Sequence, residues 1–239
     1  FPPRFYVVRP TLSNYTALPG LISKLSVPLS RYIFNSLLVS ILTTVLHVIV
    51  AAMAAFVLTQ WKGNRLIAAL FVIVQFSLLY NSYTLAIPQY LVFSKLRLID
   101  TYLVYILPYL PSALGVFLMK QYMESSIPVS LVEAARIDGA GYDRIFAVIY
   151  LPLCKQILIT LGLYNFINSW NNFLTPLVML NSTEKFTVSL LLSTYKVMYN
   201  IDWSLLMAAS TVSVLPTMLL FILAQKHFVE GITVAGVKG

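Results

Sequence analysis

Five stretches of this chain contain no aspartate, glutamate, lysine or arginine, and each is long enough to cross a membrane. They cover residues 32–61, 66–94, 101–119, 156–183 and 203–225. A helix rises about 1.5 Å per residue and the hydrocarbon core is about 30 Å thick, so about 20 apolar residues span it. Lipid offers the backbone no hydrogen-bond partner, so every backbone polar group must be paired within the protein. Only helices or a closed barrel achieve this. Barrel strands alternate apolar and polar residues, and runs such as LHVIVAAMAAFVL do not, so we predict an all-α polytopic membrane protein with five spans.

Prolines and short polar turns set the boundaries that we expect for these spans. The spans are predicted at about 32–60, 66–87, 102–119, 157–180 and 205–223. Pro88 should close the second span, and Pro108 and Pro111 should kink the third, because each proline removes a helix hydrogen bond. Residues 1–31 contain five prolines and are expected to be an irregular lead-in. We therefore predict a single transmembrane domain, residues 1–239.

The composition excludes several kinds of site. Hydrophobic residues make up 59% of the chain and charged residues 10%, which is typical of a membrane protein. The formal net charge is +8, but the basic residues are scattered over the loops, which favours contact with lipid headgroups over nucleic-acid binding. His47, His227 and Cys154 are far apart in the sequence, so no metal site is expected. Because His47 lies within a span, we expect it to hydrogen-bond to a neighbouring helix.

The segment 120–155 interrupts the apolar pattern with eight charged residues. Ser130 and Glu133 have the S-x-x-E spacing of a capping box, so a short helix is expected to start at Ser130, or with Pro128 as its first residue. Gly139 follows where this helix needs a left-handed cap, a conformation that glycine adopts at little cost.

A second short helix is expected after this corner, from Tyr142 to Pro152, and Gly141 should keep the corner flexible. Its apolar face is predicted to carry Ile145, Val148 and Ile149. In the first helix, small residues stand beside an acidic one: Glu133, Ala134 and Ala135. Amphipathic helices that lie on lipid usually carry bulky apolar residues, so this face favours a protein partner over a surface hairpin without one.

This segment resembles the signature loop of bacterial ABC importer permeases, in which EAA is followed after three residues by G and after nine more by I-x-L-P. The residues that fill the pattern are Glu133, Ala134, Ala135, Gly139, Ile149, Leu151 and Pro152. In that family the loop lies in the cytoplasm and docks in a cleft of an ATPase subunit. The resemblance implies that 120–155 is a cytoplasmic coupling loop and that 1–31 and 182–203 are external. Lysine and arginine do not decide the orientation, because both sides would carry eight.

The resemblance extends over nearly the whole chain. SWNNFLTPL, DWSLLMAAS and FVEGITVAGVKG are similar to the carbohydrate-uptake branch, and specifically to the smaller, second permease subunit of the maltose transporter. The implied structure is the type I importer permease fold with cytoplasmic coupling helices. Members have six spans, so five of a probable six are visible and the first is expected to be missing.

The implied function is the import of a sugar or oligosaccharide across the bacterial cytoplasmic (inner) membrane. This chain has no phosphate-binding G-x-x-x-x-G-K-[ST] loop, so it is expected to be non-catalytic and to hold no cofactor. The resemblance places ATP and Mg on a pair of partner ATPase subunits. It also implies a second permease subunit and an extracytoplasmic solute-binding protein that contacts residues 182–203.

Two alternatives remain open at this stage. The same type of permease could carry glycerol phosphate, a polyol or a peptide. A stand-alone secondary transporter or channel is a different class, but it would need ionisable residues for coupling, and the five apolar runs lack acidic and basic residues.

Polar side chains within the apolar runs are candidates for the translocation path. They are Asn165, Asn168, Trp170, Asn171, Asn172, Gln75 and Asn81. Amides and indoles suit sugar hydroxyls and sugar faces, and polar groups inside a membrane often line a cavity. Hydrogen bonding between helices is the alternative, and we favour it for the WNNF residues because that motif is shared across the family.

Overall fold

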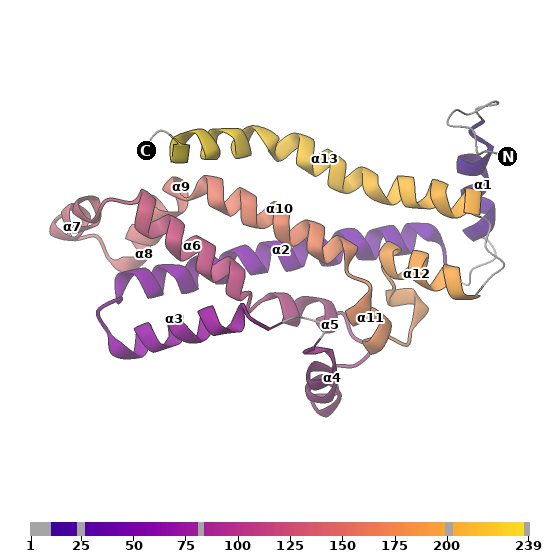
Figure 1. The fold of residues 1–239 in the computed structure, drawn as a ribbon, viewed down its shortest axis with the longest axis horizontal. Coiled ribbons are helices and arrows are strands. Elements are labelled where there is room, and N and C mark those ends of the chain that lie inside the picture. Colours follow the sequence, from indigo (N-terminus) through magenta and orange to yellow (C-terminus); the bar gives the residue numbers. More distant parts are fainter. Residues whose placement is uncertain (1–10, 23–26, 81–83, 199–202, 237–239) are drawn as a thin grey trace.

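The computed structural model describes residues 11–22, 27–80, 84–198 and 203–236 of the 239-residue chain. Every regular element in these ranges is a helix, which confirms the predicted all-α class. The helices form an elongated bundle (Figure 1). Helix α2 runs along it, with α7 and α8 at one end and α11 and α12 at the other.

In chain order the elements are α1 (Ser13–Ile22), α2 (Leu29–Gln60), α3 (Arg65–Ser77), α4 (Ala86–Lys95), α5 (Leu103–Ile106), the 3₁₀-helix η1 (Leu107–Tyr109), α6 (Ala113–Ser126), α7 (Val129–Ile137), α8 (Tyr142–Ile145), the π-helix η2 (Phe146–Tyr150), α9 (Leu151–Leu153), α10 (Lys155–Asn171), α11 (Leu174–Met179), the 3₁₀-helix η3 (Thr183–Lys185), α12 (Val188–Met198) and α13 (Trp203–Gly236).

Three helical stretches are long and apolar enough to cross a membrane. They are Leu29–Gln60, Leu103–Ser126 and Leu206–Gln225. A fourth span results if Tyr142–Leu153 and Lys155–Asn171 count as one helix, although the two parts are bent by 76°. The described residues therefore hold three to four such spans, where the sequence predicted five. The first, third and fifth predicted spans correspond to the three unambiguous ones.

The predicted second span, 66–87, is not one continuous helix. Helix α3 begins after Asn64, whose side chain accepts a hydrogen bond from the Leu66 amide at 2.8 Å, and it ends at Ser77. Pro88 does not close a helix either, because it lies in the first turn of α4. Proline is tolerated there since the first-turn amides have no helical partner in any case.

The third predicted span is broken where its prolines require. Pro108 lies in η1, Pro111 follows it, and α6 starts only at Ala113. Ser112 begins α6 by accepting a hydrogen bond from the Gly115 amide at 3.2 Å. The helix then continues to Ser126, beyond the predicted end at 119, so the sequence underestimated its length.

The contacts of Lys120 explain how α6 continues past residue 119 although this charged residue lies within it. Its Nζ lies 2.7 Å from Glu124 Oε2, one helical turn later, and 4.2 Å from the centroid of the Phe71 ring on α3. The lysine residue is only 8% exposed, so the ion pair and the aromatic face replace water around the cation.

The fourth predicted span, 157–180, is also interrupted. Helix α10 ends at Asn171, Asn172 takes an extended backbone conformation, and α11 covers the remaining apolar residues. The lead-in likewise differs from its prediction, because part of it forms α1, which packs against α13.

Small residues let α2 pack closely against α6 and α10. Ala51, Ala52 and Ala55 are almost completely buried. Opposite them, Gly115 of α6 approaches α2 so closely that a Cβ added there would lie 2.7 Å from His47 Nε2. Backbones approach in this way where side chains are small, which is the usual geometry between helices in membranes.

Candidate coupling site and polar span residues

The first helix of the charged segment begins directly after Pro128. Pro128 has an extended backbone, its carbonyl accepts a hydrogen bond from the Leu131 amide at 3.2 Å, and no side chain caps the helix. The predicted start at Ser130 is therefore wrong, and so is the alternative with Pro128 as first helical residue. The fixed φ of proline starts the helix here without a capping side chain.

The corner after α7 is closed by glycine, as predicted. Gly139 has φ of +80°, the left-handed conformation that favours glycine. The Ala140 amide donates to the Ala135 carbonyl at 2.9 Å, and the Gly139 amide donates to Arg136 at 3.0 Å. These two bonds form a Schellman motif. Gly141 instead has φ of −71°, a conformation open to any residue, so nothing in its backbone requires glycine.

The second helix of the segment continues further than Pro152, which was predicted to end it. Helix α8 passes into the π-helix η2 and then into α9, and the 76° bend comes at Cys154. A π-helix has a wider turn than an α-helix, which changes the direction of the side chains within it. Ile145 is accordingly buried while Val148 is 63% exposed, so the predicted shared face does not include Val148.

The signature residues divide into an exposed group and a packed group. Glu133, Ala134, Gly139 and Pro152 are exposed. Ala135, Ile149 and Leu151 are half-buried against the core cluster beneath the loop. Within the described residues, the Glu133 carboxylate has no hydrogen bond or ion pair.

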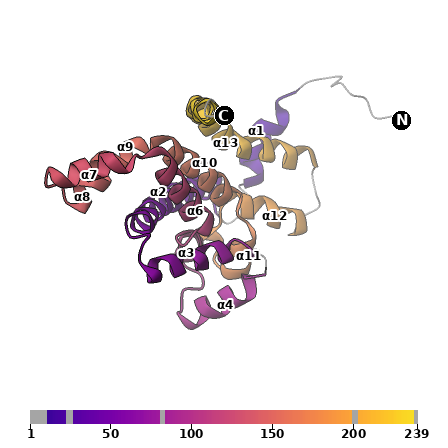
Figure 2. The ribbon, with the colours of Figure 1, turned by 60° about the vertical axis from the view of Figure 1, so that its left-hand side comes forward.

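The exposed group lies on a part of the molecule that projects from the bundle. Figure 2 shows α7 and α8 extending beyond the other helices. At the end of α7, Ile137 is 87% exposed. A free carboxylate, small residues and one large apolar side chain together form a surface that can be covered by another protein.

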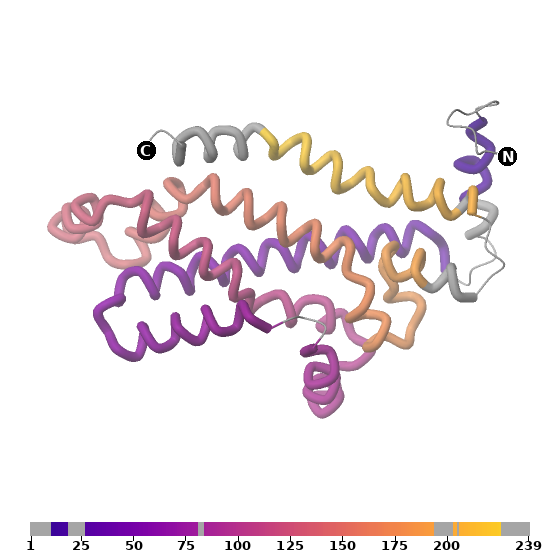
Figure 3. Tube along the Cα trace, in the orientation of Figure 1, coloured from indigo at the N-terminus to yellow at the C-terminus, as the bar shows by residue number. Residues whose placement is uncertain are grey.

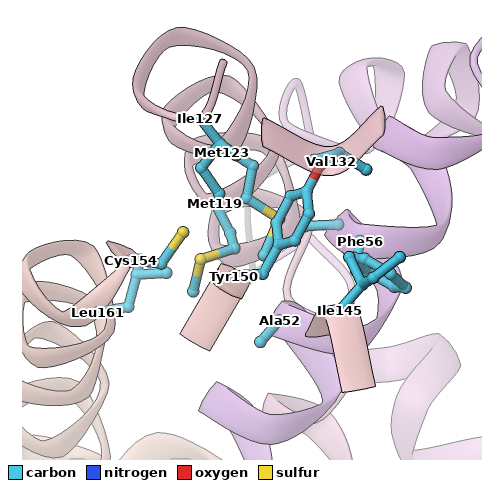
Figure 4. Close-up of a cluster of buried hydrophobic side chains, with 11 residues drawn as sticks. Ala52, Phe56, Met119, Met123, Ile127, Val132, Ile145, Tyr150, Cys154 and Leu161 are labelled. Atoms are coloured by element: carbon cyan, nitrogen blue, oxygen red, sulfur yellow. The ribbon is translucent and has the colours of Figure 1, made fainter. Parts of the chain in front are cut away.

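The packed group rests on a cluster shared by α2, α6 and the charged segment. Figure 4 shows Phe56 from α2 beside Tyr150 from η2, with Met119 and Met123 from α6 around them. The Phe56 and Tyr150 ring centroids are 4.9 Å apart in an edge-to-face arrangement. Cys154 is buried in the same cluster.

Polar contacts also join the segment to the end of α2. Arg136 Nη2 donates to Gln60 Oε1 at 2.7 Å, and Gln60 Nε2 donates to the Tyr150 hydroxyl at 2.7 Å. The Trp61 ring lies 4.7 Å from the Tyr142 ring, whose centroid is 5.0 Å from the Arg136 guanidinium. No local pattern in the sequence links residues so far apart, so these contacts could not be predicted from it.

A second polar network lies at the opposite end of the bundle. Asp100 Oδ1 accepts hydrogen bonds from the Asn181 amide at 3.2 Å and the Ser182 amide at 3.0 Å. Asp100 Oδ2 accepts from the Ser182 hydroxyl and pairs with Lys185 Nζ at 3.0 Å. Burial alone would raise the pKa of Asp100, but the hydrogen bonds from Ser182, Lys185 and Asn181 outweigh it and hold the pKa well below its usual value.

The same loop is also bonded to α2. Asn35, which is fully buried, donates through Nδ2 to the Glu184 carbonyl at 2.8 Å and to the Phe186 carbonyl at 2.9 Å. Its Oδ1 accepts from the Tyr102 hydroxyl at 3.0 Å. The Val188 amide at the start of α12 donates to the Ser36 hydroxyl at 2.9 Å.

The candidate path residues fall into different environments. Asn165 is buried and donates to Thr44 Oγ1 of α2 at 3.4 Å, and buried Trp170 donates through Nε1 to the Ser213 carbonyl of α13 at 3.0 Å. These two therefore hydrogen-bond between helices. His47 does the same, since its Nδ1 lies 2.8 Å from the Tyr109 carbonyl, as the sequence predicted.

The remaining candidates are more accessible. Asn168 and Asn171 are exposed and donate to carbonyls of their own helix at 2.9 Å. Asn172 is half-buried, and its Nδ2 has no partner in the described structure. Gln75 is exposed on α3, away from this group in sequence, and Asn81 lies outside the described residues.

Comparison with known proteins adds to this geometry. Residues 47–234 match the family model described as "Binding-protein-dependent transport system inner membrane component". The arabinooligosaccharides transport system permease protein AraQ of Halalkalibacterium halodurans is 36% identical over 207 residues, covering 86% of this chain and 73% of the relative. AraQ of Bacillus subtilis is 35% identical over 211 residues, covering 87% and 74%. The crystal structure of a bacterial ABC transporter involved in the import of the acidic polysaccharide alginate contains a chain with a TM-score of 0.73 and 25% identity, covering 89% of this chain and 79% of that one.

Proposed function

The chain belongs to the family of binding-protein-dependent transport system inner membrane components, and from this membership we propose that it carries a sugar or oligosaccharide into a bacterial cell. The membership confirms the predicted ABC importer permease of the inner membrane, a non-catalytic subunit of its transporter. The observation that supports a sugar is the similarity to relatives named for arabinooligosaccharides transport.

Uptake by the reconstituted transporter tests the solute. Proteoliposomes holding the whole complex, with its binding protein outside, are offered labelled arabinooligosaccharides, glycerol phosphate, a polyol and a peptide. We expect uptake of the oligosaccharide that depends on the binding protein and on ATP. Uptake of one of the other solutes alone would reject the sugar and leave the importer assignment intact.

We further propose that α7 docks on an ATPase subunit and that this end of the bundle faces the cytoplasm. The support is the projecting position of α7 with its free Glu133 carboxylate and the 87% exposed Ile137. In this arrangement ATP and Mg bind to a pair of partner ATPase subunits, and a second permease subunit completes the membrane part. ATP-driven closure of the ATPase pair would displace α7 and, through the packed group, tilt the spans.

Glu133→Ala tests the docking surface. Truncating one member of a buried charged contact costs about 2–5 kcal/mol, so ATP hydrolysis should continue while transport falls at least tenfold. Asp143→Ala, at another exposed acidic residue of the segment, is the matched control and should transport normally. Wild-type transport by Glu133→Ala in a normally assembled complex would reject the docking surface.

We propose that the opposite end, with the loop 182–203, is external and contacts the solute-binding protein. The described part of this loop is held on α2 by Asn35 and Ser36, which supports a fixed surface rather than a loose connection. The candidate path residues belong to the same proposal. Asn168 and Asn171 are exposed on α10, whereas Asn165 and Trp170 bond inside the chain.

Thiol labelling tests that division of the path residues. After the buried Cys154 is replaced by serine, a cysteine at Asn171 should react with a water-soluble thiol reagent, and added substrate should slow the reaction. A cysteine at Asn165 should stay unreactive in the same complex. Equal labelling of both positions would reject the division, and labelling at position 171 that substrate does not slow would remove Asn171 from the path.

A further inference from the structure

Helix α2 hydrogen-bonds to both loops that are proposed to meet partner proteins. At one end, Asn35 donates to the carbonyls of Glu184 and Phe186, and Ser36 accepts from the first amide of α12. At the other end, Gln60 accepts from Arg136 of α7 and donates to Tyr150 of η2. Figure 1 shows these two ends at opposite extremes of the bundle.

The distance between the two attachments exceeds the thickness of the hydrocarbon core of the membrane. Asn35 and Gln60 are separated by 25 residues, so at 1.5 Å per residue they lie about 38 Å apart along the helix axis. The hydrocarbon core is about 30 Å thick. Both polar attachments can therefore stand outside the apolar layer, one on each side of it.

Helix α2 is suited to act as a rigid element between them. It contains neither glycine nor proline from Leu29 to Gln60, and Figure 3 traces it as one continuous helix. Two of the other described spans are interrupted, one by its break at η1 and one by the 76° bend at Cys154, and α13 is continuous but contains Pro216. Prolines and such breaks are where helices bend.

We infer that Asn35 and Gln60 are positioning residues that fix the external loop and the coupling loop to the two ends of α2, so that displacement of one loop is transmitted to the other. The inference rests on the proposed function, because it assumes that the binding protein meets the first loop and the ATPase meets the second. Allosteric coupling of this kind needs a shared element whose position both sites change.

The test measures how strongly the loaded binding protein stimulates ATP hydrolysis by the complete reconstituted transporter. Gln60→Leu and Asn35→Leu remove the hydrogen bonds at one end each, and we expect each to lower the stimulation at least fivefold without changing basal hydrolysis. In the double variant the stimulation should be no lower than in the more impaired of the two single variants, because both changes interrupt the same connection. Gln60→Glu can still accept from Arg136 and from the Tyr150 hydroxyl, so it should retain the stimulation.

Matched controls lie within about one and a half helical turns of each site. Thr59→Ala removes a hydroxyl that bonds only within α2, and Ser40→Ala removes a buried hydroxyl with no partner in the described structure. Both should behave as wild type. If Asn35→Leu does not assemble, Ser36→Ala removes the single bond from the first amide of α12 at the same end and should lower the stimulation at least twofold.

Wild-type stimulation in Gln60→Leu, or in every assembled variant at the Asn35 end, would overturn the inference. Independent, multiplicative losses in the double variant would do the same. These outcomes differ from failure of the proposed function, in which no binding protein stimulates even the wild-type complex.

Discussion

Gly139→Ala should weaken the corner between α7 and α8, because the backbone there has φ of +80°. A Cβ added at Gly139 would meet no atom within 4 Å, so the cost is conformational and not steric. The left-handed conformation costs an L-residue about 1–2 kcal/mol, which makes local opening about 5- to 30-fold more frequent. The Schellman bonds from Gly139 and Ala140 would break in the open state.

Hydrogen exchange at the amides of residues 138–140 measures this opening, and the ATP consumed per solute transported measures its effect on coupling. Gly139→Ala should raise both, and Gly139→Val should raise them further because its side chain is β-branched. Gly141→Ala is the control: its space is also open, but its φ of −71° suits alanine. Unchanged exchange in Gly139→Ala, or an equal increase in Gly141→Ala, would refute the reasoning.

Three further predictions concern the bundle and the loop 182–203. Gly115→Ala should lower the stability of the protein by about 1–3 kcal/mol, because the added Cβ would lie 2.7 Å from His47 Nε2. Gly162→Ala is the control and should be tolerated, because the nearest atom to its added Cβ is 3.7 Å away. Thermal unfolding of the purified complex compares the stabilities of the two variants. The stabilisation that Asp100 gives to this loop should be complete above about pH 4 and should decline as pH falls below that value, until the carboxylate of the folded state is protonated at its lowered pKa. Hydrogen exchange at residues 181 and 182 follows the decline, and Asp100→Asn should remove this pH dependence. Deletion of residues 188–196 should impair stimulation by the binding protein while membrane insertion persists, as uptake and fractionation assays can check.

Each of these three has a contradicting result. Equal stabilities of the two alanine variants would mean that α6 shifts away from His47 at no cost. Exchange at residue 182 that is unaffected by acid in the wild type would mean that the carboxylate does not hold the loop. Normal stimulation after the deletion would place the binding-protein contact elsewhere.

Several features followed from local sequence and were confirmed in the structure. Long uncharged runs predicted α2 and the apolar part of α13, because lipid admits only a continuous helix of sufficient length. Pro108 and Pro111 predicted the break in the third span. Gly139 predicted its own left-handed conformation, since a helix that ends at a glycine commonly ends in this way.

The errors arose where a local signal had two structural solutions. Pro88 reads as the end of a helix, but a proline is equally compatible with a first turn, and α4 uses it there. The uncharged run at 156–183 has the length of a span, yet it is divided at Asn172 into two helices. Val148 has the right spacing for the buried face of an α-helix, and the π-helical turn changed that spacing.

By itself, then, the sequence determined that the chain is a helical membrane permease with a charged segment between its spans, which we propose docks on a partner protein. Charge-free length and the local backbone preferences of proline and glycine act over a few residues, and they are legible in one sequence. Only the tertiary structure decided how that segment is held. Arg136 meets Gln60 across 76 residues and Asn35 meets Phe186 across 151, and such pairs form because α2 brings distant loops to its ends.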